Sequence, residues 1–98
     1  MNLFVYGILM SKFYRRDYNY IEYDYIKGYS LREIIIDDET YLESYENING
    51  IISGQIILGI SDEYLKTLDE YEGDTYKRIK IKTEINKSPC EFYCSIVS

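Results

Sequence analysis

The main candidate for a catalytic residue is Glu72, because a predicted helix over residues 62–72 places this acid on its apolar stripe. At 100° per residue, Glu72 lies four positions after Leu68 and seven after Leu65, so it projects between the two leucines. A carboxylate in such a place is costly unless it is paired or has a task, and it is suited to act as a general base. The alternative is that the helix frays before Gly73 and that Glu72 only caps a solvated end.

A second candidate is the turn that follows the apolar run Leu3–Tyr6. Gly7 permits a tight turn at the end of a buried strand and lets backbone N–H groups approach a ligand closely. Such donors hold a carboxylate or a developing oxyanion. A strand followed by glycine is, however, most often a plain turn, so this hypothesis needs support from elsewhere in the chain.

Composition restricts the chemistry further, because the 98 residues include no histidine and carry a formal net charge of −6. Without histidine, Ser-His and Cys-His nucleophilic designs and most zinc sites are excluded. Acid-base chemistry must then use a carboxylate, a tyrosine, a lysine or a cysteine, and we expect neither a metal nor a cofactor. The negative charge argues against nucleic-acid binding, and we interpret the isolated pair Arg15–Arg16 as a solvated turn.

The sequence indicates a cytoplasmic protein, and the spacing of its two cysteines indicates that both are free thiols. No stretch of about 18 apolar residues occurs, so we predict no membrane span. The start, Met1 to Met10, lacks the charge order and cleavage site of a secretory signal. On a strand, Cys90 and Cys94 would share one face about 13 Å apart, which is too far for a disulfide. We interpret them as small buried residues.

The elements that position these residues form a β-rich α+β pattern with one main helix and no domain boundary in residues 1–98. Residues 18–36 are predicted to be extended with a break at Gly28, and an acidic loop is expected to open at residues 37–39. Residues 50–60 are predicted as β-structure in which Gly54 is a bulge or a point of close approach.

The helix itself has clear boundaries, because Ser61 is a good N-cap and Gly73 a good terminator. Tyr64 and Tyr71 are expected to widen its apolar stripe. Beyond the helix, residues 76–84 alternate as a strand does, with two isoleucines on one face and three cations on the other: Ile79, Ile81, Arg78, Lys80 and Lys82.

Together these segments resemble the gamma-glutamylcyclotransferase-like family in order and separation. Residues 3–9 are similar to its F-V-Y-G-T-L signature, residues 27–31 to its G-Y-x-L strand and residues 52–56 to its V-x-G-E-V strand. The most specific match is residues 65–78, L-K-T-L-D-E-Y-E-G-D-T-Y-K-R, which are close to L-x-x-L-D-x-[YF]-E-G-x-x-Y-x-R.

The resemblance implies a small mixed β-barrel, with its main helix near residues 62–72 and a pocket between the first turn and the helix end. It implies that Glu72 moves a proton while a γ-glutamyl α-amine attacks the γ-carbonyl of the same molecule, releasing 5-oxoproline and an amine. The implied partner is a small γ-glutamyl compound, and no oligomeric state is indicated. The implied substrate-binding residues are Tyr6, Gly7, Ile8 and Leu9, with Tyr76 and Arg78 as supports.

Two departures from the family pattern keep other functions open. Ile8 stands where the signature usually has threonine, and we expect no tail after Ser98 to cover the pocket. These features favour a module that binds a small ligand without turnover. The acidic, tyrosine-rich surface would suit a protein-interaction module. The block from Glu72 to Arg78 favours an enzyme.

Overall fold

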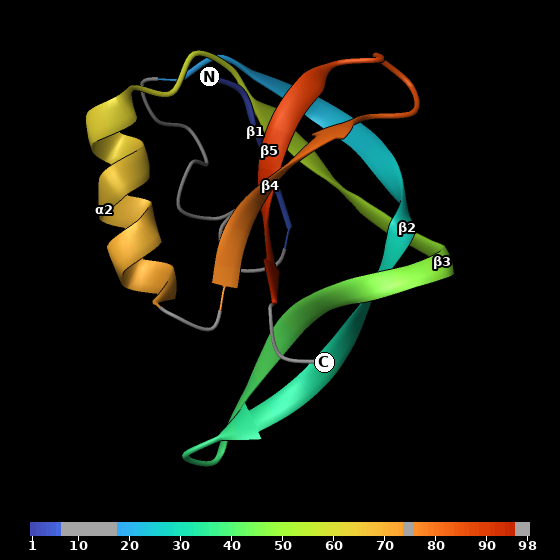
Figure 1. The fold of residues 1–98 in the computed structure, drawn as a ribbon, viewed down its shortest axis with the longest axis vertical. Coiled ribbons are helices and arrows are strands. Elements are labelled where there is room, and N and C mark those ends of the chain that lie inside the picture. The colour runs from blue at the N-terminus through green and yellow to red at the C-terminus, as the bar shows by residue number, and fades with distance from the viewer. Residues whose placement is uncertain (7–17, 74–75, 96–98) are drawn as a thin grey trace.

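The computed structural model describes residues 1–6, 18–73 and 76–95, and they form a five-stranded sheet with one helix (Figure 1). The strand order is β2-β3-β1-β5-β4, in which β1 pairs parallel with β5 and every other neighbouring pair is antiparallel. The predicted α+β class with one main helix is therefore confirmed. The elements in chain order are β1 (Leu3–Val5), β2 (Tyr20–Ile36), β3 (Glu39–Ile57), α2 (Asp62–Glu72), β4 (Tyr76–Lys82) and β5 (Pro89–Ser95).

The sheet is curled but open in the described ranges. Strands β2 and β4 stand at the two ends of the strand order, and no hydrogen-bonded ladder joins them there. They approach each other where the backbone N–H of Glu84, just after β4, donates to the carbonyl of Tyr25 in β2 at 2.9 Å. The predicted barrel is therefore not confirmed, because the edges approach each other without completing the ring of hydrogen bonds.

Strands β2 and β3 form one long hairpin that extends past the rest of the sheet (Figure 1). Asp37 and Asp38 form its turn with positive φ values of 50° and 65°, as a type I′ turn requires at both central positions. The acidic loop expected at residues 37–39 is thus only a two-residue turn, and the strand resumes at Glu39. The break predicted at Gly28 is a register shift within β2, where glycine adopts a φ of 93°.

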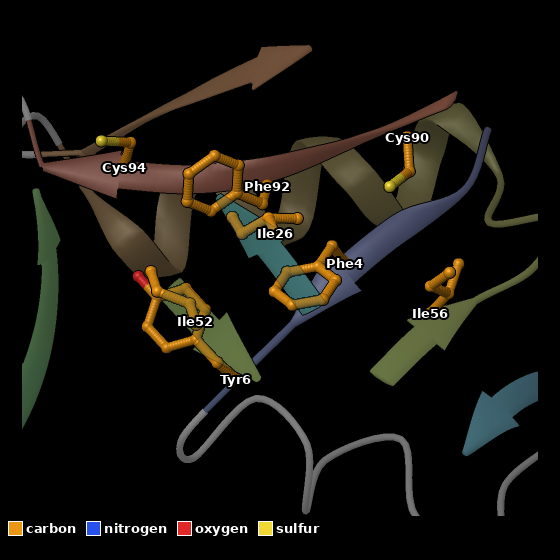
Figure 2. Close-up of a cluster of buried hydrophobic side chains, with 8 residues drawn as sticks. All are labelled: Phe4, Tyr6, Ile26, Ile52, Ile56, Cys90, Phe92 and Cys94. Carbon is orange, nitrogen blue, oxygen red and sulfur yellow. The ribbon is translucent and has the colours of Figure 1, made fainter. Parts of the chain in front are cut away.

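Two cores lie on opposite faces of the sheet because successive β1 side chains point to opposite sides. The helix-side core lies between α2 and the sheet and consists of Leu3, Val5, Ile57, Ile60, Leu65, Leu68 and Tyr93. The inner core fills the concave side of the curled sheet (Figure 2) and consists of Phe4, Tyr6, Ile26, Ile52, Ile56, Cys90, Phe92 and Cys94.

Helix α2 follows the sequence prediction at both ends. The Ser61 hydroxyl oxygen accepts from the backbone N–H of Tyr64 at 3.2 Å, and Gly73 ends the helix with a φ of 76°. Tyr71, predicted on the apolar stripe, is instead 53% exposed. It lies one residue, or about 100°, from Glu72 around the helix, which places it at the exposed margin of the apolar stripe.

The cysteines are confirmed as buried free thiols of the inner core. Cys90 and Cys94 share one face of β5, as alternation predicts. Burial, with a smaller contribution from the charge of Asp24, raises the pKa of the Cys90 thiol to about 12. At neutral pH this thiol is therefore protonated, and it packs as a small apolar side chain.

Asp24 fastens the turn between β4 and β5 to strand β2. This fully buried acid accepts hydrogen bonds from the backbone N–H groups of Tyr25, Ile85 and Asn86 at 2.7, 2.9 and 3.0 Å. The side-chain amide of Asn86 donates to it at 2.8 Å. Burial alone would raise the pKa of Asp24, but these hydrogen bonds outweigh burial and hold its pKa well below the usual range. The ionised carboxylate thus joins the two edges of the sheet.

We predict that Asp24→Asn lowers the free energy of unfolding at pH 7 by about 2–3 kcal/mol, because buried donors lose a charged acceptor. The pKa of Asp24 is lower in the folded chain than in the unfolded chain, so its contribution is present above about pH 4 and is lost as pH falls further. Urea unfolding from pH 7 to pH 3 should therefore show a shallower decline for this variant. Glu22→Gln, an exposed acid on the same strand, is the control; identical declines in all three proteins would contradict the assignment.

Gly54 is a point of close approach, as predicted. A Cβ atom there would overlap the carbonyl oxygen of Val5 and lie 2.9 Å from the ring of Phe4.

We predict that Gly54→Ala lowers the free energy of unfolding by about 1–3 kcal/mol, because β1 must shift to accommodate the methyl group. Chemical denaturation measures the loss, and Ser53→Ala at the exposed neighbouring position should change stability far less. Equal effects of the two substitutions would show that β1 has room to move.

Candidate functional site

The candidate site lies where four elements end or begin. Strands β1 and β5 are parallel, so their carboxyl ends lie together, and Tyr76 at the start of β4 pairs with Ser95 at the end of β5. The last turn of α2 reaches the same end of the sheet (Figure 1). The β2–β3 hairpin contributes Ser44, whose hydroxyl donates to the carbonyl of Tyr93 in β5 at 2.8 Å.

Glu72 is half-buried in the last turn of α2, at the position that the sequence predicts for it. The helix continues through Glu72 without fraying, and the N–H of Gly73 donates to the carbonyl of Asp69 at 3.0 Å. The carboxylate is therefore held at the edge of the packed structure instead of at a frayed, solvated end.

The charge of Glu72 acts on three tyrosines at this end of the sheet. Burial is the main cause that raises the pKa values of Tyr6, Tyr76 and Tyr93, and the negative charge of Glu72 adds to the increase in each. These phenols therefore stay protonated at neutral pH. A half-buried acid beside neutral phenols can accept and return a proton as a general base.

Tyr6 is the part of the predicted substrate-binding turn that the structure describes. Its hydroxyl lies 2.8 Å from the hydroxyl of Ser44 and 2.8 Å from the carbonyl oxygen of Tyr93, so two hydroxyl groups share one carbonyl acceptor. The side chain of Tyr6 is buried and fully hydrogen-bonded. The other members of the predicted turn, Gly7, Ile8 and Leu9, lie outside the described residues, and so does that side of the predicted pocket.

Tyr76 is half-buried, and the charges of two acids act on it. After burial, the charge of Glu43 and then that of Glu72 raise the pKa of Tyr76, while the charge of Arg32 lowers it. The second acid, Glu43, comes from β3. The site therefore holds one carboxylate from the helix and one from the hairpin, with a protonated phenol near both.

Glu43 was not identified from the sequence, although it is only 8% exposed. A hydrogen bond from Ser95 and the ion pair with Arg32, whose Nε lies 3.2 Å from Oε2, hold the pKa of Glu43 below its usual range despite burial. Arg32 and Glu43 are direct cross-strand partners. Only the register of the hairpin reveals this pair, because the sequence predicts extended structure up to residue 36 and again from residue 50 but no strand between them.

Arg78 joins the helix to the sheet. Its Nε and Nη2 donate to the two carboxylate oxygens of Asp69 at 2.8 and 3.1 Å, and its Nη1 donates to Glu91 at 2.8 Å. The hydroxyl of Tyr93 donates to the same Asp69 carboxylate at 2.7 Å. The predicted support residue Arg78 is thus committed to two carboxylates, one turn of helix away from Glu72.

Two other kinds of site have no counterpart in the part of the chain that the structure describes. Within residues 1–6, 18–73 and 76–95, no group of three or more His, Cys, Asp or Glu side chains could hold a metal ion. The same ranges contain no helix with the length and apolarity that crossing a membrane requires.

Comparisons with known proteins identify the fold. A family model described as gamma-glutamyl cyclotransferase, AIG2-like, matches residues 3–97. Solution structures of two Arabidopsis thaliana proteins match with TM-scores of 0.70 and 0.69 at 22% and 23% identity, covering 98% and 97% of this chain and 68% and 61% of theirs. The crystal structure of an uncharacterized Pyrococcus horikoshii protein matches with a TM-score of 0.74 at 17% identity, covering 99% of this chain and 79% of that one. No curated protein matches significantly. At these identities, the solved structures show the fold alone.

We predict that Arg78→Gln lowers the free energy of unfolding by about 2 kcal/mol, because Asp69 and Glu91 lose the cation between them. Lys80→Gln removes an exposed cation from the same strand and should change stability by less than about 0.5 kcal/mol. Urea unfolding of the two variants measures the difference. Similar losses would show that the network is only a surface ion pair.

Proposed function

Since the chain belongs to the gamma-glutamyl cyclotransferase, AIG2-like family, we propose that it is a cyclotransferase acting on a small γ-glutamyl compound. The observation that carries this proposal is the position of Glu72, half-buried at the end of α2 with a charge that acts on Tyr6 and Tyr76. We treat residues 1–98 as one domain with this activity and expect it in the cytoplasm.

In the proposed reaction the nitrogen of the substrate α-amine bonds to its own γ-carbonyl carbon. The bond between that carbon and the amide nitrogen breaks, which closes the five-membered ring of 5-oxoproline and releases an amine. Glu72 takes the proton from the attacking nitrogen and returns it to the leaving amine. Because the nucleophile is part of the substrate, the protein contributes orientation and proton transfer and forms no covalent intermediate.

We assign substrate binding to the residues that match the family signature. Backbone groups of Tyr6, Gly7, Ile8 and Leu9 would hold the glutamyl end and the developing oxyanion. Tyr76, which stays protonated, would donate a hydrogen bond to the substrate. We assign Arg78 to a supporting role, because its guanidinium binds Asp69 and Glu91.

A module that binds the same class of ligand without turnover is the second candidate. It is favoured by Ile8, which replaces the threonine usual in the family signature by a side chain that offers no hydroxyl. If that hydroxyl contributes to positioning the γ-carbonyl, its loss slows the reaction while the site still recognises the glutamyl end.

We predict that Glu72→Gln lowers kcat for 5-oxoproline release by about 100-fold or more, because glutamine keeps the shape of the acid but cannot accept the proton. The measurement is 5-oxoproline release from a panel of γ-glutamyl amines and dipeptides. Glu70→Gln changes an exposed acid on the same helix and should leave the rate unchanged. Turnover that survives in Glu72→Gln would reject this residue as the base. Binding of a γ-glutamyl compound from the panel by the wild type, without release of 5-oxoproline, would favour the second candidate.

A further inference from the structure

Tyr93 makes hydrogen bonds to two parts of the candidate site. Its side-chain hydroxyl bonds to the helix, and its backbone carbonyl accepts from residues of other strands. The residue lies on β5, an interior strand between β1 and β4, and is only 2% exposed. Its hydroxyl donates to Asp69 of α2 at 2.7 Å. Its backbone carbonyl accepts from the hydroxyls of Tyr6 and Ser44, each at 2.8 Å. One residue therefore contacts both the helix that carries Glu72 and the end of β1.

The bond from the Tyr93 hydroxyl acts close to the acid. Asp69 precedes Glu72 by three residues, so it lies about one helical turn away. The backbone carbonyl of Asp69 accepts from the N–H of Gly73 at 3.0 Å, and its side chain is held on the other side by Arg78. A shift of the Asp69 carboxylate would therefore move the last turn of α2, and the carboxylate of Glu72 with it.

The bonds to the Tyr93 carbonyl act close to the substrate-binding turn. Tyr6 is the residue after β1 and immediately precedes Gly7. Its side chain is buried, and the hydroxyls of Tyr6 and Ser44 satisfy the Tyr93 carbonyl together. The chain thus enters the predicted turn from a point that is fixed to β5.

A purely apolar role would not require this hydroxyl. Phenylalanine would fill almost the same volume in the helix-side core, and burying a hydroxyl group is favourable only when it is hydrogen-bonded. The Tyr93 hydroxyl makes its shortest bond to Asp69, while the carbonyl of Leu65 lies at 3.5 Å. The polar group is therefore directed at the one acid that lies a turn away from Glu72.

We infer that Tyr93 is a positioning residue that fixes the carboxylate of Glu72 relative to the end of β1. The inference rests on the proposed function, since it concerns the placement of the proposed base against the turn that binds the substrate. Tyr93 does not contact the substrate in this assignment. It acts through Asp69 on one side and through Tyr6 on the other, and a small misplacement of a catalytic group costs a large part of the rate.

The test is Tyr93→Phe, which removes the hydroxyl and keeps the ring and the backbone carbonyl. We expect kcat to fall about tenfold, with KM changed by less than about twofold and the acid limb of the kcat–pH profile displaced. Tyr23→Phe, on an exposed tyrosine of β2, should change none of these. In an Asp69→Ala background, Tyr93→Phe should have no further effect on kcat, because the bond is already absent. Unchanged kcat in Tyr93→Phe, or an undiminished effect in that background, overturns the inference.

A measurement without turnover separates this inference from the proposed function. Carbon-detected NMR titration of the Glu72 side chain reports its environment whether or not the protein is an enzyme. Tyr93→Phe should shift the titration of Glu72, and Tyr23→Phe should not. If the wild type releases no 5-oxoproline but the shift is found, the proposed function fails and the positioning role stands. If turnover is found and kcat is unchanged in Tyr93→Phe, the positioning role fails. If no turnover is found and the titration is also unchanged, both the proposed function and the positioning role fail.

Discussion

The ion pair between Arg78 and Asp69 determines how the helix lies against the sheet at the candidate site. The guanidinium binds both oxygens of the Asp69 carboxylate and also reaches Glu91 on β5. Two leucines alone would hold α2 on the sheet but would leave it free to rotate or slide, because hydrophobic contact is non-directional. The bidentate pair has a fixed geometry. It therefore determines which side of the last helical turn, and thus which side chain, faces the ends of β1 and β5.

The sequence predicts this region well because its signals are local. Helix periodicity places Glu72 between Leu65 and Leu68, and the N-cap and terminating glycine define the ends of the helix within one residue of their observed positions. The alternation of β4 likewise separates its isoleucines, which pack against the inner core, from Arg78 on the opposite face. Each of these features depends on residues only a few positions apart.

The parts that could not be predicted depend on strand register. Glu43 is a member of the site only because it pairs with Arg32 across the hairpin and reaches Ser95 on another strand. Asp24 is 61 and 62 residues away from two of its backbone donors, Ile85 and Asn86. In one sequence such acids look like ordinary solvated residues, and only the fold shows that they are buried and paired. Whether the sheet closes into a barrel also depends on strands that are far apart in the sequence, because it depends on how far the whole sheet curls.

The spacing of the most specific motif acquires a physical explanation from this structure. Asp69 and Glu72 are separated by one turn, so both face the sheet, one at the ion pair and the other at the site. Gly73 then ends the helix in a backbone conformation that residues with a side chain rarely adopt, and the chain reverses into β4. This reversal brings Tyr76 near the charge of Glu72 and places Arg78 opposite Asp69. A chain with one residue more or fewer between the acid and the arginine would turn Arg78 to the other face of its strand, where the inner core lies.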